Sequence, residues 1–334
     1  MKKALITGVT GMVGSHMCDF LLKETDWKIF GLCRWRSNPE NVSHLINKDK
    51  NKINFLYGDL NDFSSLFKIL KELRPDYIFH LAAQSFPKTS FDSPLETLNT
   101  NIIGTANLLE SLKILDLKKT WVQICSSSEV FGRVQKDMLP INEECNFHPA
   151  SPYAISKVGT DLVGRFYAEA YNMNTITTRM FTHTGPRRGD VFAESSFAKQ
   201  IAMIEEGKLK PYINVGNLNS LRTYGDVRDA VKAYYMALTV NPTKGEYYNI
   251  GGNHTCTVGE MLDQLLSISK LKECKIKIDK NRLRPIDADL QVPDISKFSK
   301  HTKWKPRISF KKTMTDLLNH WRKKVKQNNF LSLR

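Results

Sequence analysis

Two residues suited to proton transfer lie one helical turn apart near the middle of the chain. The segment SPYAISK places Tyr153 and Lys157 four positions apart, and Ser151 and Pro152 are suited to begin a helix that carries both. Side chains at this spacing share one helix face. A free tyrosine has a pKa of about 10, and a nearby ammonium favours its phenolate. The pair therefore predicts a tyrosine base that removes a proton from a hydroxyl group.

A carboxylate stands upstream of this pair, at the end of an apolar run. The segment TWVQI is typical of a buried strand, and CSSSEVFGR follows it with three serines and then Glu129. A hydroxyl such as Ser127 and a carboxylate at a strand end are well placed to join Tyr153 and Lys157. We expect these four side chains to form one site.

Alternating short apolar runs and helical patterns must position that site. The sequence predicts strands at 3–7, 27–32, 53–57, 77–82 and 121–125, and helices between them at 13–24, 62–73 and 94–115. Such alternation predicts an α/β fold with a Rossmann-type, doubly wound parallel sheet and right-handed crossovers.

The pattern loosens after about residue 180, and helices are expected there only at 193–207, 228–240, 257–270 and 309–325. We expect a smaller, mixed α/β lobe over the carboxyl ends of the sheet. The prediction is a dinucleotide-binding domain over residues 1–180, which also carries the Ser, Glu, Tyr and Lys, and a mainly substrate-binding lobe over residues 181–330.

A glycine-rich turn joins the first strand to the first helix. ALITGVTGMVGSH spaces Gly8, Gly11 and Gly14 as G-x-x-G-x-x-G, which permits a tight turn and lets a pyrophosphate approach the helix amino end. Its position after a strand and before an amphipathic helix predicts dinucleotide binding.

The end of the second strand indicates which dinucleotide binds. An acid there would hold the ribose of NAD, but this chain has Arg34, Arg36 and Ser37, which suit the 2′-phosphate of NADP. The alternative is that these arginines only solvate the loop or touch another subunit. The residues expected to contact NADP are Gly8, Thr10, Gly11, Met12, Val13, Gly14, Arg34, Arg36, Ser37, Asp59, Leu60, Leu81, Ala82, Ala83, Gln84, Tyr153, Lys157 and His183.

Composition narrows the remaining possibilities. The 334 residues carry 49 Lys and Arg against 34 Asp and Glu, a net charge of +15, but no nucleic-acid motif occurs and the lysines are spread along the chain. We therefore expect solvated faces and an anionic small substrate, with no nucleic acid partner. No apolar run is long enough to cross a membrane, no secretory signal is expected at the first residues, and six scattered cysteines favour the cytoplasm. The histidines show no metal-ligand spacing, so no metal is expected.

These motifs resemble the extended short-chain dehydrogenases/reductases that modify nucleotide sugars, and are most similar to GDP-mannose 4,6-dehydratases. The resemblance covers nearly the whole chain, through TGVTGMVGSH, HLAAQS, SSSEVFG, SPYAISK, GPRRG, RTYGDVRD and RPIDADL. It implies that Ser127 bonds the sugar 4-hydroxyl, that Tyr153 and Lys157 are the base and its helper, and that Glu129 is the dehydratase glutamate. A C4 ketone would acidify the C5 proton for Glu129 to remove, the C6 hydroxyl would leave as water, and hydride would return to C6.

The resemblance also implies residues for the nucleotide sugar. Arg222 and Arg284 would hold the diphosphate, and Asp287 would contact the nucleoside. Arg187 is expected nearer the nucleotide and cofactor, Ser85 facing the sugar, and Asn217 near the substrate. Thr182 stands where the family commonly has a substrate-contacting Asn, so a GDP-linked hexose other than mannose, a heptose or an N-acetyl sugar stays open. A homodimer or homotetramer is a family expectation, through the helix 94–115 and the helix that starts at Tyr153.

Two alternatives stay open. The first is an NADP(H)-dependent reductase of GDP-4-keto-6-deoxy sugars, or a GDP-sugar 4-dehydrogenase or epimerase, on the same fold. The second is a nucleotide-sensing or nucleic-acid-binding protein with a relict site. The complete set of Ser127, Glu129, Tyr153 and Lys157 favours the enzyme.

Overall fold

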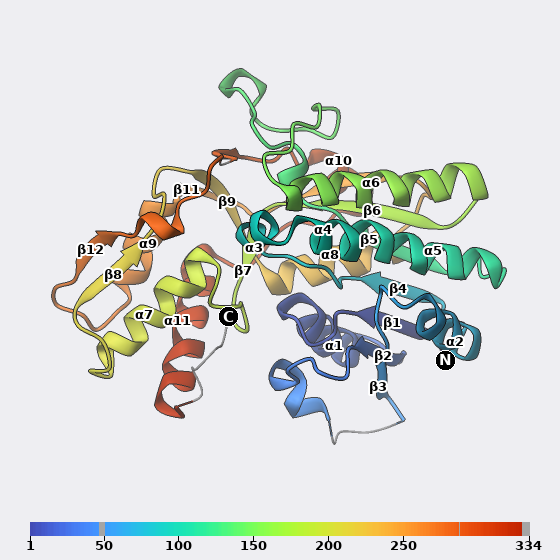
Figure 1. The fold of residues 1–334 in the computed structure, drawn as a ribbon, viewed down its shortest axis with the longest axis horizontal. Helices are drawn as coiled ribbons and strands as arrows, with labels where there is room; N and C mark the ends of the chain where they lie inside the picture. Colours follow the sequence, from blue (N-terminus) through green and yellow to red (C-terminus); the bar gives the residue numbers. More distant parts are fainter. Residues whose placement is uncertain (47–50, 287, 329–334) are drawn as a thin grey trace.

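A parallel sheet of seven strands forms the centre of the first lobe in the computed structural model, which describes residues 1–46, 51–286 and 288–328 (Figure 1). Its strand order is β10-β6-β5-β4-β1-β2-β3, and every pair in it is parallel. The Rossmann-type fold is thereby confirmed. The strands are β1 (Lys3–Thr7), β2 (Lys28–Cys33), β3 (Ile53–Tyr57), β4 (Tyr77–His80), β5 (Trp121–Cys125), β6 (Thr175–Met180) and β10 (Tyr247–Ile250).

Helices cover both faces of this sheet. On one face α1 (Met12–Glu24) packs against α8 (Val227–Thr239), and on the other α2 (Phe63–Leu73) and α6 (Pro152–Tyr171) pack against α5 (Gly104–Ile114). Side chains alternate along a strand. In β1, Ala4 and Ile6 accordingly join the core beside α1 and α8, while Leu5 joins the core beside α2 and α5.

The predicted helix 94–115 is helical throughout but contains one wider turn. It runs as α4 (Pro94–Leu98), the π-helix η2 (Asn99–Ile103) and α5, and the short α3 (Pro87–Asp92) precedes it. Asn101 is buried in the wide turn, and its carbonyl accepts hydrogen bonds from the hydroxyls of Thr105 and Thr160. These extra acceptor contacts account for a local departure from α-helical bonding.

In its described residues, the second lobe contains two small sheets and three helices around its own core. In the first sheet β9 (Leu221–Asp226) pairs with β7 (His183–Thr184), β11 (His254–Thr257) and β13 (Leu290–Gln291). In the second, β8 (Tyr212–Val215) pairs with β12 (Lys275–Ile278). The helices are α7 (Ala193–Glu205), α9 (Val258–Ser267) and α11 (Phe310–Lys326).

The chain crosses between the lobes more often than a single division would require. Helix α8 and strand β10 follow the predicted division at residue 180 but belong to the large sheet and its cover. Helix α10 (Ser296–Thr302) packs against β10. The assignment of dinucleotide binding to residues 1–180 and mainly of substrate binding to residues 181–330 therefore stays a prediction.

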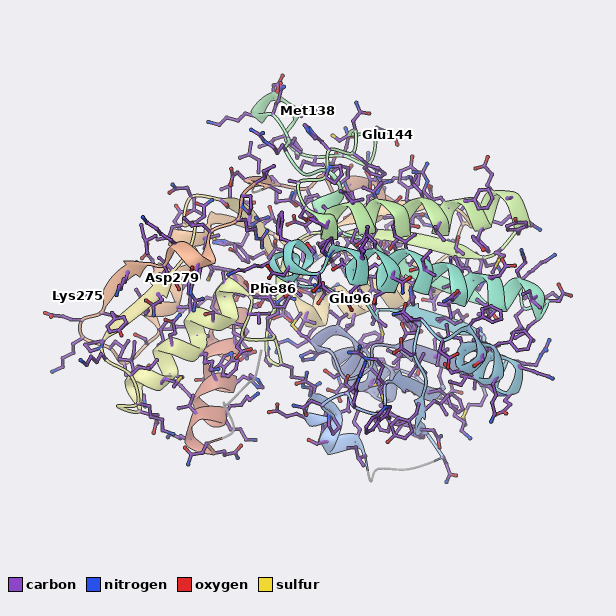
Figure 2. All side chains as sticks on the ribbon, in the orientation of Figure 1. Phe86, Glu96, Met138, Glu144, Lys275 and Asp279 are labelled. Carbon is purple, nitrogen blue, oxygen red and sulfur yellow. The ribbon has the colours of Figure 1, made fainter. Side chains whose placement is uncertain are left out.

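Short helical turns and one long excursion complete the fold. The turns are η1 (Glu40–Leu45), η3 (Ser128–Val130), η4 (Lys136–Met138) and η5 (Lys280–Arg282). Figure 2 places Met138 and Glu144 on the excursion between η3 and α6, which projects above the sheet. Within the described residues, no helix combines the length and the apolar character needed to cross a membrane.

Candidate active site

Strand β5 and helix α6 bring the predicted proton-transferring groups together. Ser127 caps η3, and its hydroxyl accepts a hydrogen bond from the Glu129 backbone N–H at 3.2 Å. Ser151 caps α6 in the same way, accepting from the Ala154 N–H at 3.0 Å, so that Tyr153 lies in the first turn. Lys157 then reaches back, and its Nζ donates to the Cys125 carbonyl at 2.8 Å.

The pKa values of Tyr153 and Lys157 are governed by burial. Tyr153 is 8% exposed and Lys157 is 5% exposed. Burial raises the pKa of Tyr153, and it lowers the pKa of Lys157 below its usual value. The spacing of the two residues predicts that the ammonium lowers the pKa of Tyr153. However, Lys157 Nζ is hydrogen-bonded to the Cys125 carbonyl and lies 5.9 Å from the Tyr153 ring centre. Among the groups that lower the Tyr153 pKa, the Ser127 side chain has the largest effect, through a hydrogen bond.

Glu129 forms an ion pair with an arginine of the second lobe. Arg222 Nη1 on β9 lies 3.6 Å from Glu129 Oε1, and both side chains are largely buried. Arg222 stands opposite Gln291 in the pairing of β9 with β13, and Gln291 Nε2 donates to the Ser128 carbonyl at 3.4 Å. The second lobe therefore contacts the Ser127–Glu129 turn directly.

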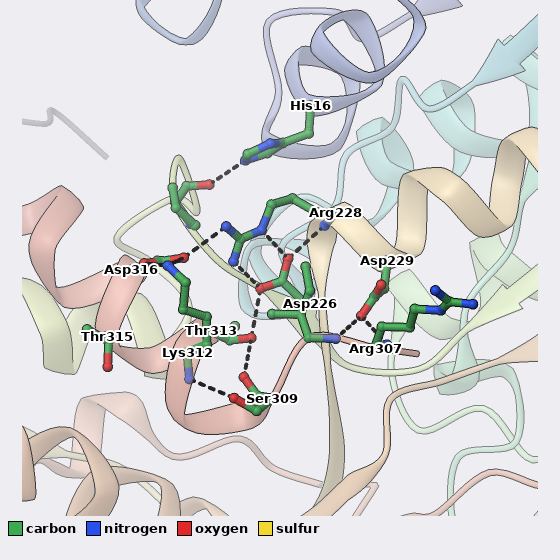
Figure 3. Close-up of polar contacts among 12 residues, drawn as sticks. His16, Asp226, Arg228, Asp229, Arg307, Ser309, Lys312, Thr313, Thr315 and Asp316 are labelled. Carbon is green, nitrogen blue, oxygen red and sulfur yellow. Dashed lines mark hydrogen bonds and ion pairs between the residues drawn. The ribbon is translucent and has the colours of Figure 1, made fainter. Parts of the chain in front are cut away.

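A buried carboxylate holds β9 in place. Asp226 accepts hydrogen bonds from Arg228 Nε at 2.8 Å and from the Thr313 hydroxyl of α11 at 2.7 Å, as Figure 3 shows. Arg228 also reaches Asp316 on α11 at 2.8 Å. This network ties the strand that carries Arg222 to the last long helix.

The glycine turn leaves no room for side chains at Gly8 and Gly14. Gly8 has φ +67°, and a Cβ there would lie 2.7 Å from the Ala82 Cα. A Cβ on Gly14 would lie 2.3 Å from the Gly8 carbonyl oxygen. Gly11 caps α1 without a side-chain hydrogen bond, so the first-turn N–H groups can face a phosphate.

The other predicted cofactor residues follow the carboxyl ends of neighbouring strands. Arg34 and Arg36 are exposed after β2, and the backbone N–H of Ser37 donates to the Arg34 carbonyl. Leu60 is buried after β3, next to Asp59. After β4, the backbone N–H groups of Leu81 and Ala82 both donate to the Thr7 hydroxyl.

Gln84 and Ser85 lie at the same edge, where the chain turns into α3. The Gln84 side chain is already engaged, because its Oε1 accepts from the Phe86 N–H and its Nε2 donates to the Phe86 carbonyl. Ser85 is exposed. Figure 2 places Phe86 near the junction of the two lobes.

His183 offers an unsatisfied nitrogen to an outside group. Its Nδ1 contacts the Phe181 carbonyl at 3.1 Å, while its buried Nε2 has no hydrogen-bond partner in the described part of the chain. Burial lowers the pKa of His183 to about 4, so the ring is neutral near pH 7. These features fit a hydrogen bond between His183 and a bound dinucleotide. The neighbouring Thr182 is fixed through its carbonyl, which accepts from the Gly225 N–H at 2.8 Å.

The two arginines of GPRRG contact different parts of the protein. Arg187, with φ +70°, pairs with Asp19 on α1 at 2.7 Å. Arg188, which the sequence analysis did not select, stacks its guanidinium 3.4 Å from the Phe192 ring centre and favours the charged form of Tyr153. Two adjacent arginines in a loop carry no sequence signal that separates these roles.

The remaining predicted substrate residues lie in the second lobe. Asn217 Nδ2 donates to the Ser220 hydroxyl at 3.0 Å, which orders the turn before β9. Arg284 is half-buried, and Asp287 lies outside the described residues. In the described ranges, no group of three or more His, Cys, Asp or Glu side chains is arranged to hold a metal ion.

The fold and this site define an extended short-chain dehydrogenase/reductase. The sequence profile described as GDP-mannose 4,6 dehydratase matches residues 5–317, nearly the whole length. The chain therefore belongs to the GDP-mannose 4,6-dehydratase family.

Individual relatives agree with this family. The chain is 32% identical to the GDP-mannose 4,6-dehydratase of Yersinia enterocolitica, over 99% of this chain and 96% of that protein. It is 30% identical to the human GDP-mannose 4,6 dehydratase, over 95% of this chain and 90% of that protein. Among solved structures, RMD from Pseudomonas aeruginosa complexed with NADPH is similar, with a TM-score of 0.82 and 28% identity over 97% of this chain and all of that one. A UDP-glucose 4-epimerase from Thermotoga maritima with UDP-glucose has a TM-score of 0.84 and 26% identity, over 97% of this chain and 99% of that one.

Proposed function

We propose that this protein is a GDP-sugar 4,6-dehydratase. It would convert GDP-mannose, or a related GDP-linked hexose, heptose or N-acetylhexosamine, into the 4-keto-6-deoxy sugar. The observation that carries the proposal is that Glu129 and Ser127 share one turn at the end of β5, beside Tyr153 and Lys157. Membership of the GDP-mannose 4,6-dehydratase family supports the same reaction.

NADP is the proposed cofactor. Exposed Arg34 and Arg36, the glycine turn and the orphaned Nε2 of His183 all suit it, and the similar RMD protein is complexed with NADPH. When bound, NADP supplies a hydride acceptor for C4 and a hydride donor for C6, and it ends unchanged. Gly8, Gly11 and Gly14 would hold the pyrophosphate against the amino end of α1.

Two side chains, Tyr153 and Glu129, would move the protons. Ser127 would orient the sugar 4-hydroxyl, and Tyr153, as phenolate, would take its proton with Lys157 supplying positive charge. Glu129 would remove the C5 proton and pass it to the departing C6 hydroxyl, which leaves as water. The proton that Tyr153 then holds balances the one required at C5 when C6 is reduced. The sugar loses one water and the enzyme regains its starting protonation.

Arginines of the second lobe would hold the substrate. Arg222 and Arg284 suit the diphosphate because a guanidinium binds phosphate oxygens bidentately. Ser85 and Thr182 would face the sugar, and Asn217 would support the nucleotide. The place of Arg222 on β9, beside Glu129, supports its role.

A homodimer or homotetramer is proposed on the outer face of α4–η2 and α6. Leu95 is 78% exposed, and Ile155, Leu162 and Phe166 on α6 are each about half exposed. Their spacing on α6 puts them on one face. Contiguous exposed apolar side chains of this kind mark association surfaces.

Six free thiols favour a reducing compartment, and we propose the cytoplasm.

Product analysis tests the proposed function. The purified protein is incubated with catalytic NADP and a panel of nucleotide sugars, and the products are weighed by mass spectrometry. The expected product is lighter than a GDP-sugar by one water, with no net change in the absorbance of reduced nicotinamide. Stoichiometric oxidation or reduction of the nicotinamide without loss of water would instead indicate a dehydrogenase or reductase.

A further inference from the structure

The ion pair between Arg222 and Glu129 is not used by the proposed reaction. The two charged groups lie 3.6 Å apart, with only 13% of the Arg222 side chain and 14% of the Glu129 side chain exposed. Coulomb attraction is stronger at such a site than in bulk water. The proposed function assigns Arg222 to the substrate diphosphate and Glu129 to the sugar. One guanidinium therefore faces two anionic groups.

The backbone holds both members of the pair within reach of each other. Arg222 lies between two strands, opposite Cys256 of β11 and Gln291 of β13. Gln291 contacts the Ser128 carbonyl, and the Ser127 hydroxyl holds the Glu129 N–H. Because the two backbones are fixed, the pair can change only by rotation of the side chains.

A diphosphate is a stronger partner for Arg222 than a single carboxylate at this distance. Phosphate oxygens accept two parallel hydrogen bonds from a guanidinium, and a diphosphate carries more negative charge than a carboxylate. We propose that Glu129 and the substrate diphosphate compete for Arg222, so that seating of the diphosphate releases the Glu129 carboxylate to act as the base. This inference rests on the proposed function and adds a link between binding and chemistry.

Thermodynamic linkage makes the competition measurable without turnover. If the diphosphate weakens the ion pair by some factor, the Glu129 carboxylate must weaken diphosphate binding by the same factor. Removing the carboxylate should therefore tighten GDP binding, but only while Arg222 is present. Arg222 is then a positioning residue for Glu129 as well as a diphosphate ligand.

The experiment is a double-mutant cycle read by calorimetric titration of GDP into the NADP-saturated protein. Glu129→Gln should bind GDP roughly three- to tenfold more tightly than the wild type. Arg222→Gln should bind GDP more weakly, and adding Glu129→Gln to it should produce no further tightening. Glu129→Asp, with its carboxylate drawn back by one methylene, should lie between the wild type and Glu129→Gln, and it provides the comparison if Glu129→Gln does not fold.

Two results would overturn the inference. One is an unchanged GDP affinity in Glu129→Gln and Glu129→Asp. The other is the same tightening in the Arg222→Gln background, which would mean simple charge repulsion between Glu129 and GDP. The proposed function fails separately, if the wild-type protein dehydrates no GDP-sugar whatever the outcome of the cycle.

Discussion

At the residue scale, the phenol of Tyr153 is the group whose chemistry depends most on its surroundings. Burial raises its pKa, while Ser127 and Arg188 act against that rise. Replacement of Tyr153 by Phe removes the proton acceptor but preserves the ring that packs in the first turn of α6. The expected result is a loss of roughly 10²- to 10⁴-fold in kcat, with unchanged GDP affinity and thermal stability.

Tyr171→Phe is the matched control for this variant, because Tyr171 is 36% exposed at the last residue of α6, about five helical turns from Tyr153. Its kcat should equal that of the wild type. A Tyr153→Phe enzyme that kept wild-type kcat would show that another group takes the 4-hydroxyl proton.

Sequence spacing indicates which residues share one face of a helix, but not how each side chain is directed. Tyr153 and Lys157 lie one turn apart as expected, since helical periodicity dictates it. The contact of Lys157 with the Cys125 carbonyl, and the pairing of Arg187 with Asp19, depend on tertiary neighbours that lie far away in the chain. The contact between Glu129 and Arg222 joins two lobes and had no local signal.

At the scale of elements, the glycine turn combines a backbone requirement with a steric one. Gly8 has φ +67° and no room for a Cβ beside Ala82, whereas Gly207 has φ +69° and open space around it. Gly8→Ala should weaken NADP binding at least about tenfold, because the turn must shift away from the pyrophosphate. Gly207→Ala should cost only about 1 kcal/mol of stability and leave NADP affinity unchanged.

Titration of NADP by fluorescence checks both variants. Equal losses of NADP affinity in the two variants would contradict this account. They would mean that the strain of a left-handed alanine, and not the contact between Gly8 and Ala82, weakens binding.

A buried ion pair joins α6 to β6 beneath the excursion that follows Glu129. Arg179 is 1% exposed, contacts both oxygens of the buried Asp161 at 2.8 and 3.1 Å, and donates to the Glu143 carbonyl at 2.7 Å. Arg179→Met leaves the buried Asp161 carboxylate with only its longer contact to Arg165, and should lower the free energy of unfolding by about 3–5 kcal/mol.

Arg165 supplies the matched control, because it approaches the same Asp161 at 3.8 Å but is 35% exposed. Arg165→Met should cost less than about 1 kcal/mol. Urea unfolding measures both variants, and similar losses for the two would contradict a special role for the buried pair.

The sequence predicts a helix or strand best where its apolar residues recur at regular spacing. Strands β1 to β5 and helices α7, α8, α9 and α11 all lie where apolar spacing predicts them. Strand β6 was not identified because TITTRM is rich in threonine, although every residue in it is buried and Thr175 and Thr178 satisfy their hydroxyls internally. The return of β10 to the large sheet is a tertiary pairing with no local pattern.

At the scale of the whole molecule, one buried and three partly buried histidines make stability depend on pH. Burial lowers the pKa of His16, His183 and His320 to about 4 and that of His80 to about 3. A depressed folded-state pKa contributes stability that is present above the unfolded value of 6.5 and is lost as pH falls toward 4 or 3. Each such group should cost roughly 2 kcal/mol at pH 5 relative to pH 7.5.

Urea unfolding between pH 7.5 and 4.5 tests this dependence. His80→Gln should flatten the decline, because the amide can still meet the Thr7 and Thr105 hydroxyls without taking up a proton. His254→Gln, at an exposed position, should leave the decline unchanged. A decline of the same slope in all three proteins would assign acid instability to other groups.

The apolar face of α4, η2 and α6 should determine the assembly state. Phe166 is 53% exposed on this face, and Phe166→Asp should convert the proposed dimer or tetramer to monomers, since an interface desolvates a charge only at high cost. Ile276→Asp on β12 is the control, because Ile276 is 46% exposed in the other lobe. Light scattering gives the molar mass, and a monomeric wild-type protein would contradict the assignment.

In the proposed reaction, one hydride leaves C4 and returns to C6 of the same sugar, with Glu129 acting between the two events. The most direct measurement uses GDP-mannose carrying deuterium at C4, incubated with the protein and unlabelled NADP, and analyses the product by mass spectrometry and NMR. The account predicts a product that has lost one water and carries the deuterium at C6. Deuterium found in the nicotinamide pool, or a product without deuterium at C6, would contradict it.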